Sequence, residues 1–268
     1  MTAEFALQGV RHTYGPGICS LDGIDLAIEA GEHVAIVGAN GSGKSTLLKM
    51  LDGLVFCTSG TITSAGRPLT EEALEEPAFR REFRSRVGFV FQDADVQLFC
   101  NTVFDELAFG PLQLVLGPDE VRGRVGEVAD ALRIERLLDR APYTLSGGEK
   151  KRVAIASVLT MRPEVLLMDE PTNALYPRSQ VWLLDVLDQW KRAGRTVVIA
   201  THDLSAAAES CDRMIVLSEE HTVVADGAPE DVLAQRDLLL KVNLVHEHAH
   251  RHGADRHVHP HAHEHEHA

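Results

Sequence analysis

The sequence lacks any long apolar run. None of its hydrophobic stretches approaches the ~20 residues that a membrane-spanning helix needs. The first residues also lack the order of a secretory signal, in which a charged segment precedes an apolar one. If the protein works at a membrane, we therefore expect it to do so through a partner protein.

Paired cysteines and excess positive charge are absent too. The four cysteines are widely separated and form no Cys-x-x-Cys pair, which indicates free thiols in a reducing compartment. The formal net charge of −14 disfavours an extended nucleic-acid surface, so we expect no nucleic-acid partner. The chain has 268 residues, 44% of them hydrophobic, which suits one globular domain with subdomains or an appendage.

One stretch, Val34–Leu51, predicts a phosphate-binding site. An apolar, β-branched segment leads into Gly38-x-x-x-x-Gly43-Lys44-Ser45, and a helix with an apolar face follows. The glycines permit a tight loop whose N–H groups converge on phosphate oxygens, and the helix N-terminus adds partial positive charge. This order is that of a P-loop, in which the lysine reaches the β- and γ-phosphates and the serine ligates Mg²⁺.

Three more apolar segments of the chain end at polar residues: Gln92, Asp169 with Glu170, and Thr201 with His202. Ligands of open parallel α/β sheets bind at the carboxyl ends of the strands, so we expect these groups near the phosphates. Asp169 can hold Mg²⁺, and Glu170 can polarise the attacking water as general base. Gln92 can ligate Mg²⁺ or orient water, and His202 can donate to the γ-phosphate. Considered alone, each of these residues is also compatible with a structural role.

A second phosphate-facing motif lies at Leu145–Glu149, with the sequence LSGGE. Ser146 and Glu149 fit a capping box, which is the structural explanation. A cap does not require Gly147 and Gly148, however. Glycines at a helix N-terminus expose N–H groups to an anion, and the two motifs need not bind the same nucleotide.

The remaining pattern predicts an α/β fold with a mostly parallel core sheet. Short segments separated by turns, in residues 4–11, 21–28 and 60–64, indicate an antiparallel β subdomain. Helical spacing in residues 101–138 and 149–160 indicates an inserted helical subdomain at about residues 95–158, within a domain of residues 1–245. We expect residues 93–99 to form a loop and residues 229–242 to form one helix.

Together these motifs resemble the nucleotide-binding subunit of ABC transporters, a P-loop NTPase fold. The resemblance rests on GANGSGKST, Gln92, LSGGE, LLMDEPT and His202, and it covers about Thr2–Val242. It implies a head-to-tail homodimer, or a heterodimer with a related ATPase, that holds ATP and Mg²⁺ between the subunits. One subunit would supply Tyr14 for stacking on adenine, together with Gly38, Asn40, Gly41, Ser42, Gly43, Lys44, Ser45, Thr46, Gln92, Asp169, Glu170 and His202. The other subunit would supply Ser146, Gly147 and Gly148.

A finer resemblance surrounds Gln92. The run FQDADVQLFCNTVFDELAFGP is similar to that of energy-coupling-factor importer ATPases, with Ala94 in place of the usual proline. It implies a transmembrane coupling protein and a substrate-binding membrane protein as partners, and a peripheral position at the cytoplasmic face of the cell membrane. Tyr176 stands where the family usually has an aspartate that acts across the dimer. We therefore expect an intact but slowed ATPase.

The end of the chain, His246–Ala268, contains ten of the 14 histidines. It has no hydrophobic pattern, and we expect it to be disordered. Neutral imidazole suits Ni²⁺, Co²⁺, Cu²⁺ and Zn²⁺. The predicted metal ligands are His257, His259, His261, His263, His265 and His267. An expression tag or a merely solvated tail are the alternatives, although interleaved histidines argue against a tag.

The sequence therefore predicts an ATP-hydrolysing subunit that energises import of nickel or cobalt. Three alternatives stay open. The cargo can be zinc, or a vitamin carried by an energy-coupling-factor complex. The chain can be a soluble ABC ATPase with a metal-buffering tail. It can also be a storage or regulatory protein that binds ATP without turnover.

Overall fold

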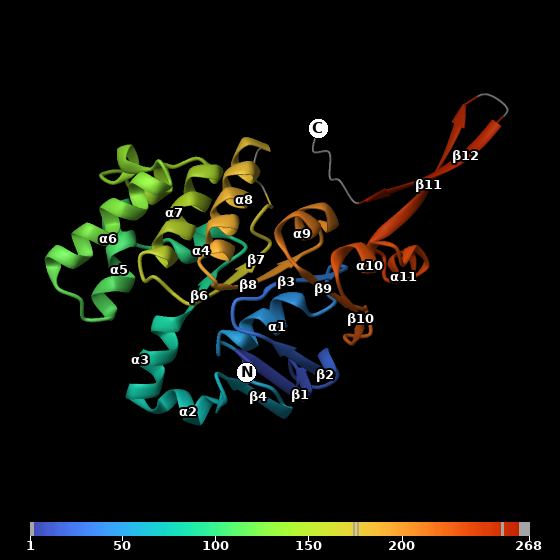
Figure 1. Ribbon diagram of the computed structural model, residues 1–268, viewed down its shortest axis with the longest axis horizontal. Coiled ribbons are helices and arrows are strands. Elements are labelled where there is room, and N and C mark those ends of the chain that lie inside the picture. Colours follow the sequence, from blue (N-terminus) through green and yellow to red (C-terminus); the bar gives the residue numbers. More distant parts are fainter. Residues whose placement is uncertain (1–2, 174, 176, 253–254, 263–268) are drawn as a thin grey trace. The chain divides into compact units, whose positions relative to one another are not determined.

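The computed structural model describes residues 3–173, 175, 177–252 and 255–262 (Figure 1). The chain divides into two compact units: unit 1 comprises Met1–Leu69 and Val198–Ala268, and unit 2 comprises Thr70–Val197. Within the described residues, no helix is both long and apolar enough to cross a membrane.

Unit 1 contains the predicted antiparallel sheet. Its strand order is β2-β1-β4-β5, with bounds Cys19–Ile28, Phe5–Thr13, Ser59–Ser64 and Arg67–Pro68. Burial alternates along β2, because one face of the sheet packs on the core and the other meets solvent. The sequence prediction of this subdomain is thereby confirmed.

Unit 1 also contains strands of the core sheet. In the order β10-β9-β3-β8 their bounds are Val223–Gly227, Arg213–Leu217, His33–Gly38 and Thr196–Thr201. β3 runs parallel to β9, and all six of its residues are buried, which explains why its sequence is a continuous apolar run rather than an alternating one. The first two residues of β8 belong to unit 2.

The helices of unit 1 are α1 (Lys44–Leu51), α9 (Leu204–Ser210), α10 (Pro229–Leu233) and α11 (Arg236–Lys241). The expectation of one helix over residues 229–242 is wrong. The backbone of Gln235 has ψ 59°, far from the helical value, and so separates α10 from α11. Glycine or proline, the usual signals of a break, do not occur there.

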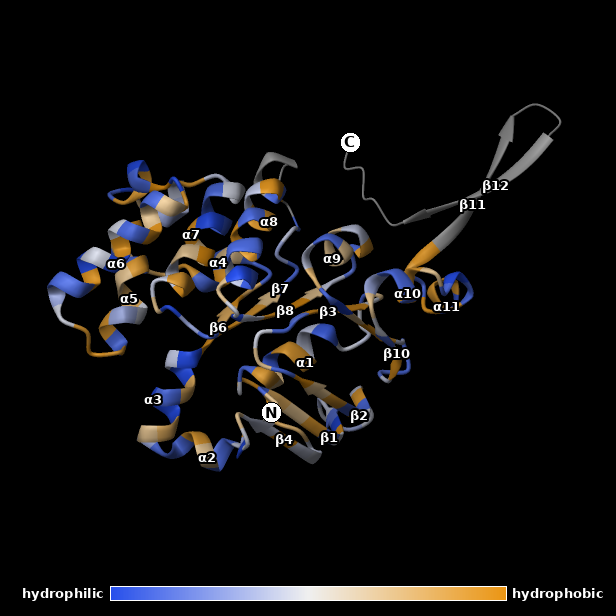
Figure 2. Ribbon diagram, in the orientation of Figure 1, coloured by the Kyte–Doolittle hydropathy of each residue, from blue (hydrophilic) through white to orange (hydrophobic). Residues whose placement is uncertain are grey.

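In unit 2, β6 (Val87–Val90) pairs in parallel with β7 (Val165–Asp169), and every residue of both strands is buried. α5 (Val103–Gln113), α6 (Pro118–Ala131) and α7 (Gly147–Leu159) lie side by side over a shared apolar core (Figure 1). Apolar residues recur among polar ones along α6, and its buried residues are spaced four apart, as in a half-buried helix (Figure 2).

The other helical elements of unit 2 are α2 (Glu71–Glu75), α3 (Pro77–Arg86), α4 (Ala94–Gln97), η1 (Glu135–Leu137), η2 (Pro142–Thr144) and α8 (Pro177–Arg192). The expected loop at residues 93–99 contains α4, which begins because Asp93 Oδ1 accepts a hydrogen bond from the N–H of Asp95 at 2.9 Å. Tyr176 lies outside the described residues.

The histidine-rich end differs from the disorder that we expected. β11 (Val245–His252) and β12 (Asp255–Ala262) pair as an antiparallel hairpin (Figure 1). The ladder between the two strands satisfies backbone N–H and C=O groups of this segment. His263, His265 and His267 lie outside the described residues.

Unit 2 offers a test of its packing at Gly88. A Cβ at this position of β6 would lie 2.4 Å from Val158 Cγ1 and 3.1 Å from Pro163 Cγ. We expect Gly88→Ala to cost about 1–3 kcal/mol of stability through overpacking. Gly123→Ala in α6, where a Cβ meets nothing within 4 Å, should be neutral or stabilise by up to about 1 kcal/mol. Thermal denaturation of the two variants checks this, and equal melting temperatures would contradict it.

Candidate nucleotide-binding site

Close contacts with neighbouring backbone fix the shape of the loop between β3 and α1. Gly43 has φ +106°, and a Cβ there would lie 2.2 Å from the carbonyl oxygen of Ser20. A Cβ at Gly38 would lie 2.5 Å from Ser42 Oγ and 2.7 Å from the carbonyl oxygen of Leu217. Both positions therefore require glycine, and the loop keeps its tight curve.

Lys44 places its charge inside this curve. The side chain is 6% exposed, and Nζ donates hydrogen bonds to the carbonyl oxygens of Gly38 at 2.7 Å and Ala39 at 3.1 Å. The ammonium group is thus held against the loop, which is where a P-loop lysine would meet the phosphates of a nucleotide. Ser45 and Thr46 follow in the first turn of α1.

Tyr14 is oriented toward the same loop. Its hydroxyl lies 3.3 Å from Thr46 Oγ1, and its ring meets the His12 ring edge to face at a centroid distance of 4.5 Å. The side chain is 45% exposed, so it keeps an open aromatic face beside the P-loop. The sequence analysis did not single out His12. Its position two residues before Tyr14, at the end of β1, was the available signal that the two rings could meet.

The carboxylates Asp169 and Glu170 lie at the carboxyl end of β7 in unit 2. Both residues are buried, and Glu170 has φ +43°, an uncommon backbone conformation for a side chain other than glycine. Such backbone strain clusters at functional sites. Gln92 follows β6 by two residues, and its carbonyl oxygen accepts a hydrogen bond from Lys151 Nζ at 2.9 Å.

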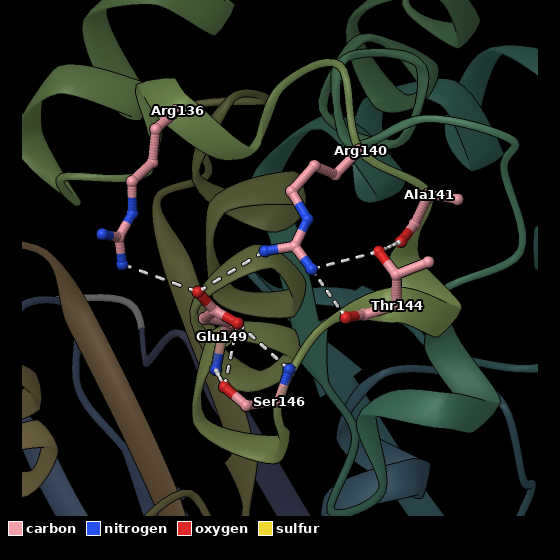
Figure 3. A network of polar contacts seen from close by, with 6 residues as sticks. All are labelled: Arg136, Arg140, Ala141, Thr144, Ser146 and Glu149. Atoms are coloured by element: carbon pink, nitrogen blue, oxygen red, sulfur yellow. Dashed lines mark hydrogen bonds and ion pairs between the residues drawn. The ribbon is translucent and has the colours of Figure 1, made fainter.

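Ser146 and Glu149 form the capping box at the start of α7 (Figure 3). Glu149 Oε2 accepts from the N–H of Ser146 at 3.0 Å and from its hydroxyl at 2.9 Å, and Oε1 lies 3.6 Å from Arg136 and 4.0 Å from Arg140. The hydrogen bonds from Ser146 are the main cause that lowers the pKa of Glu149, and the two arginines add to them.

Gly147 is not needed by the fold of its own chain. A Cβ at this position meets nothing within 4 Å, and the backbone has no positive φ. The adjoining carboxylate is turned onto Ser146 and the arginines, which leaves the start of α7 with its exposed N–H groups. The arrangement therefore fits an anion that approaches from outside this chain.

The predicted site residues are divided between the two units. Unit 1 carries Tyr14, Gly38, Asn40, Gly41, Ser42, Gly43, Lys44, Ser45, Thr46 and His202, and unit 2 carries Gln92, Ser146, Gly147, Gly148, Asp169 and Glu170. In unit 1 the structure brings Tyr14 and Thr46 together. In unit 2 it shows Lys151 joined to Gln92, which the sequence analysis did not predict.

A sequence profile described as ABC transporter matches residues 21–173. The chain belongs to the ABC transporter family. The predicted family, fold and ATP hydrolysis are thereby confirmed. The chain is 48% identical to the nickel import ATP-binding protein NikO of Rhodobacter capsulatus, over 91% of this chain and 97% of that protein.

Two solved structures are similar to this ATPase. One is cbiO1 from Clostridium perfringens, part of the ABC transporter complex cbiONQ, with 36% identity, a TM-score of 0.76, and coverage of 91% of this chain and 96% of that one. The other is the ATP-binding cassette MJ0796, a dimer bound to ADP and Pi in a post-hydrolysis state. It has 29% identity, a TM-score of 0.76, and coverage of 84% of this chain and 98% of that one.

The capping box predicts how substitutions of Glu149 affect stability. Glu149→Gln keeps an acceptor for Ser146, and the exposed arginine pairs contribute little, so we expect a change below about 0.5 kcal/mol. Glu149→Ala should cost about 1 kcal/mol at pH 7. Because the native pKa of Glu149 is lowered, the part of its stabilisation that depends on charge, which is the small difference from Glu149→Gln, should be complete above pH 4.5 and diminish as the pH falls further. Equal denaturation midpoints for both variants at pH 7 would contradict the prediction.

Proposed function

We propose that this chain is the ATPase subunit that energises import of nickel or cobalt through a membrane complex. The observation that carries the proposal is the similarity to NikO, which spans nearly the full length of both proteins. The similarity to cbiO1, part of a transporter complex, supports it. A vitamin cargo is the alternative, because the chain is also 40% identical to the energy-coupling factor protein EcfA2 of Methanospirillum hungatei over 89% of this chain and 58% of that protein.

The proposal assigns each half of the ATP site to a different subunit. Lys44 and the loop N–H groups bind the phosphates, Tyr14 stacks on adenine, and the start of α7 in a second subunit closes over the γ-phosphate. The dimeric state of MJ0796 and the open face at Gly147 support this arrangement. Two copies of this chain, or one copy with a related ATPase, would complete it.

The residues at the strand ends suit the chemistry of hydrolysis. Hydroxyl, amide and carboxylate oxygens of Ser45, Gln92 and Asp169 fit Mg²⁺, which neutralises phosphate charge when bound. Glu170 accepts the proton of the water that attacks the γ-phosphorus, and the bond to the oxygen bridging to the β-phosphate breaks. His202 donates a hydrogen bond to the γ-phosphate.

An apolar surface of unit 2 suits the membrane partners. Val96, Phe99, Phe109 and Leu112 are between 42% and 71% exposed, and the rings of Phe99 and Phe109 meet edge to face at 4.9 Å. Buried Glu106 holds the loop before α5 by accepting from the N–H groups of Phe99 and Cys100. Exposed aromatic groups on a fixed loop are typical of interaction sites. We assign this surface to the transmembrane coupling protein, at the cytoplasmic face of the membrane.

Uptake of ⁶³Ni and ⁵⁷Co by cells that express the whole assembly tests the function. Lys44→Ala should abolish uptake of the transported ion, because the loop then lacks the ammonium group that pairs with the phosphate charge. Lys49→Ala on the same helix, outside the loop, should retain it. Uptake that survives Lys44→Ala would overturn the mechanism, and uptake of neither metal by the native assembly would favour a vitamin cargo.

The proposal includes a metal-binding role for the hairpin β11–β12. The strand register places His246 opposite His261, His248 opposite His259, and His250 opposite His257. Alternate residues of a strand share a face, and directly opposed residues have Cα atoms about 4.5–5.5 Å apart. One face of the hairpin thus has six histidine positions, which suits Ni²⁺, Co²⁺ or Zn²⁺. The segment would buffer or sense the cargo ion.

Deletion of residues 247–268 tests the hairpin. The shortened protein should bind fewer nickel ions in equilibrium dialysis, because it loses nine of the ten histidines of the tail. Its ATPase activity should stay within about twofold of that of the full chain, because the deletion removes none of the predicted nucleotide-binding residues. Unchanged nickel binding would refute the metal role. Lost ATPase activity would show that the segment is structural instead.

A further inference from the structure

Lys151 is a buried cation that the mechanism above does not use. It lies in the second turn of α7 and is 4% exposed. Its Nζ donates hydrogen bonds to the carbonyl oxygens of Phe91 at 3.1 Å and Gln92 at 2.9 Å. The carboxylates of Asp169, Asp93 and Glu170 also act on its charge. The ammonium group therefore joins α7 to the segment that carries Gln92.

A further side chain joins this segment to α7. The side-chain amide of Gln97 accepts from the N–H of Phe91 at 3.1 Å and donates to the carbonyl oxygen of Ala154 at 2.7 Å. The backbone of Phe91 is thus held at its N–H by Gln97 and at its C=O by Lys151, which leaves little freedom for the residue that follows.

Fold stability does not explain a lysine at this position. Desolvation lowers the pKa of Lys151 to about 8, although the nearby carboxylates oppose that shift. Burying an ammonium group costs free energy, and a packed apolar residue often serves a fold equally well or better. The retained charge instead has specific partners: two carbonyl oxygens at the end of β6 and the carboxylates at the end of β7.

We propose that Lys151 is a positioning residue for ATP hydrolysis, which holds Gln92 in place and joins it to α7, the helix capped by Ser146. It acts through Gln92 and does not touch the nucleotide. Because α7 begins with the motif that would face the ATP of a second subunit, any displacement of α7 is passed through Lys151 to Gln92. The inference depends on ATP hydrolysis and is independent of the cargo.

Replacing Lys151 with methionine tests this role in the full chain within the assembled transporter. Lys151→Met keeps an unbranched side chain but loses the charge and both hydrogen bonds. We expect kcat for ATP to fall about tenfold or more, since small displacements of positioned groups cost this much. The Kd for ATP should change less than about twofold, because Tyr14 and the P-loop lie in unit 1. Lys151→Arg should recover part of kcat.

Lys150→Met is the matched control. It removes the neighbouring lysine of the same helix and its pair with the exposed Asp95, yet it leaves both hydrogen bonds to residues 91 and 92. Its kcat should stay within about twofold of the unsubstituted protein. Equal kcat for the two methionine variants would overturn the proposal. A lower melting temperature of Lys151→Met with lost nucleotide binding would overturn it too, since it would show a structural role.

Discussion

The close approach of Gly43 to Ser20 is the constraint on which the phosphate site depends. With 2.2 Å between a hypothetical Cβ and the Ser20 carbonyl oxygen, only glycine lets the loop return to the helix axis. That return brings the carbonyl oxygens of Gly38 and Ala39 to the ammonium group of Lys44, and these hydrogen bonds offset part of the cost of burying its charge. The charge in turn favours the binding of phosphate oxygens. The predicted phosphate binding therefore depends on how closely the backbone at Gly43 approaches the backbone at Ser20.

α7 has a capped N-terminus and also contacts the segment that follows β6. Its N-terminus is a capped helix start with free N–H groups, and its buried face holds the segment after β6 through Lys151 and Ala154. Its interior also packs against α5 and α6 through Val153 and Ala156. These contacts fix α7 at several points along its length.

Much of this architecture follows from local sequence. β3 and β7 are continuous apolar runs, and both were predicted, with the P-loop and the carboxylates that follow them. The break at Gln235 was not, because it lacks a glycine or proline signal. α4 is one turn long, too short for a hydrophobic period. The role of Lys151 depends on carbonyl oxygens 59 and 60 residues away, and no local pattern encodes such a contact.

Gly147 differs from the two glycines of the P-loop whose surroundings require glycine. Gly38 and Gly43 are explained within the chain, because a side chain there would collide with it. Gly147 has open space around its Cα and an ordinary backbone, so the isolated chain would accept alanine there without strain. Glycine also lowers the stability of a helix. Gly123 in α6 has equally open surroundings, so a glycine alone does not identify a ligand. At Gly147 the open space lies at the N-terminus of α7, where it leaves room for the phosphate that we propose a second subunit brings.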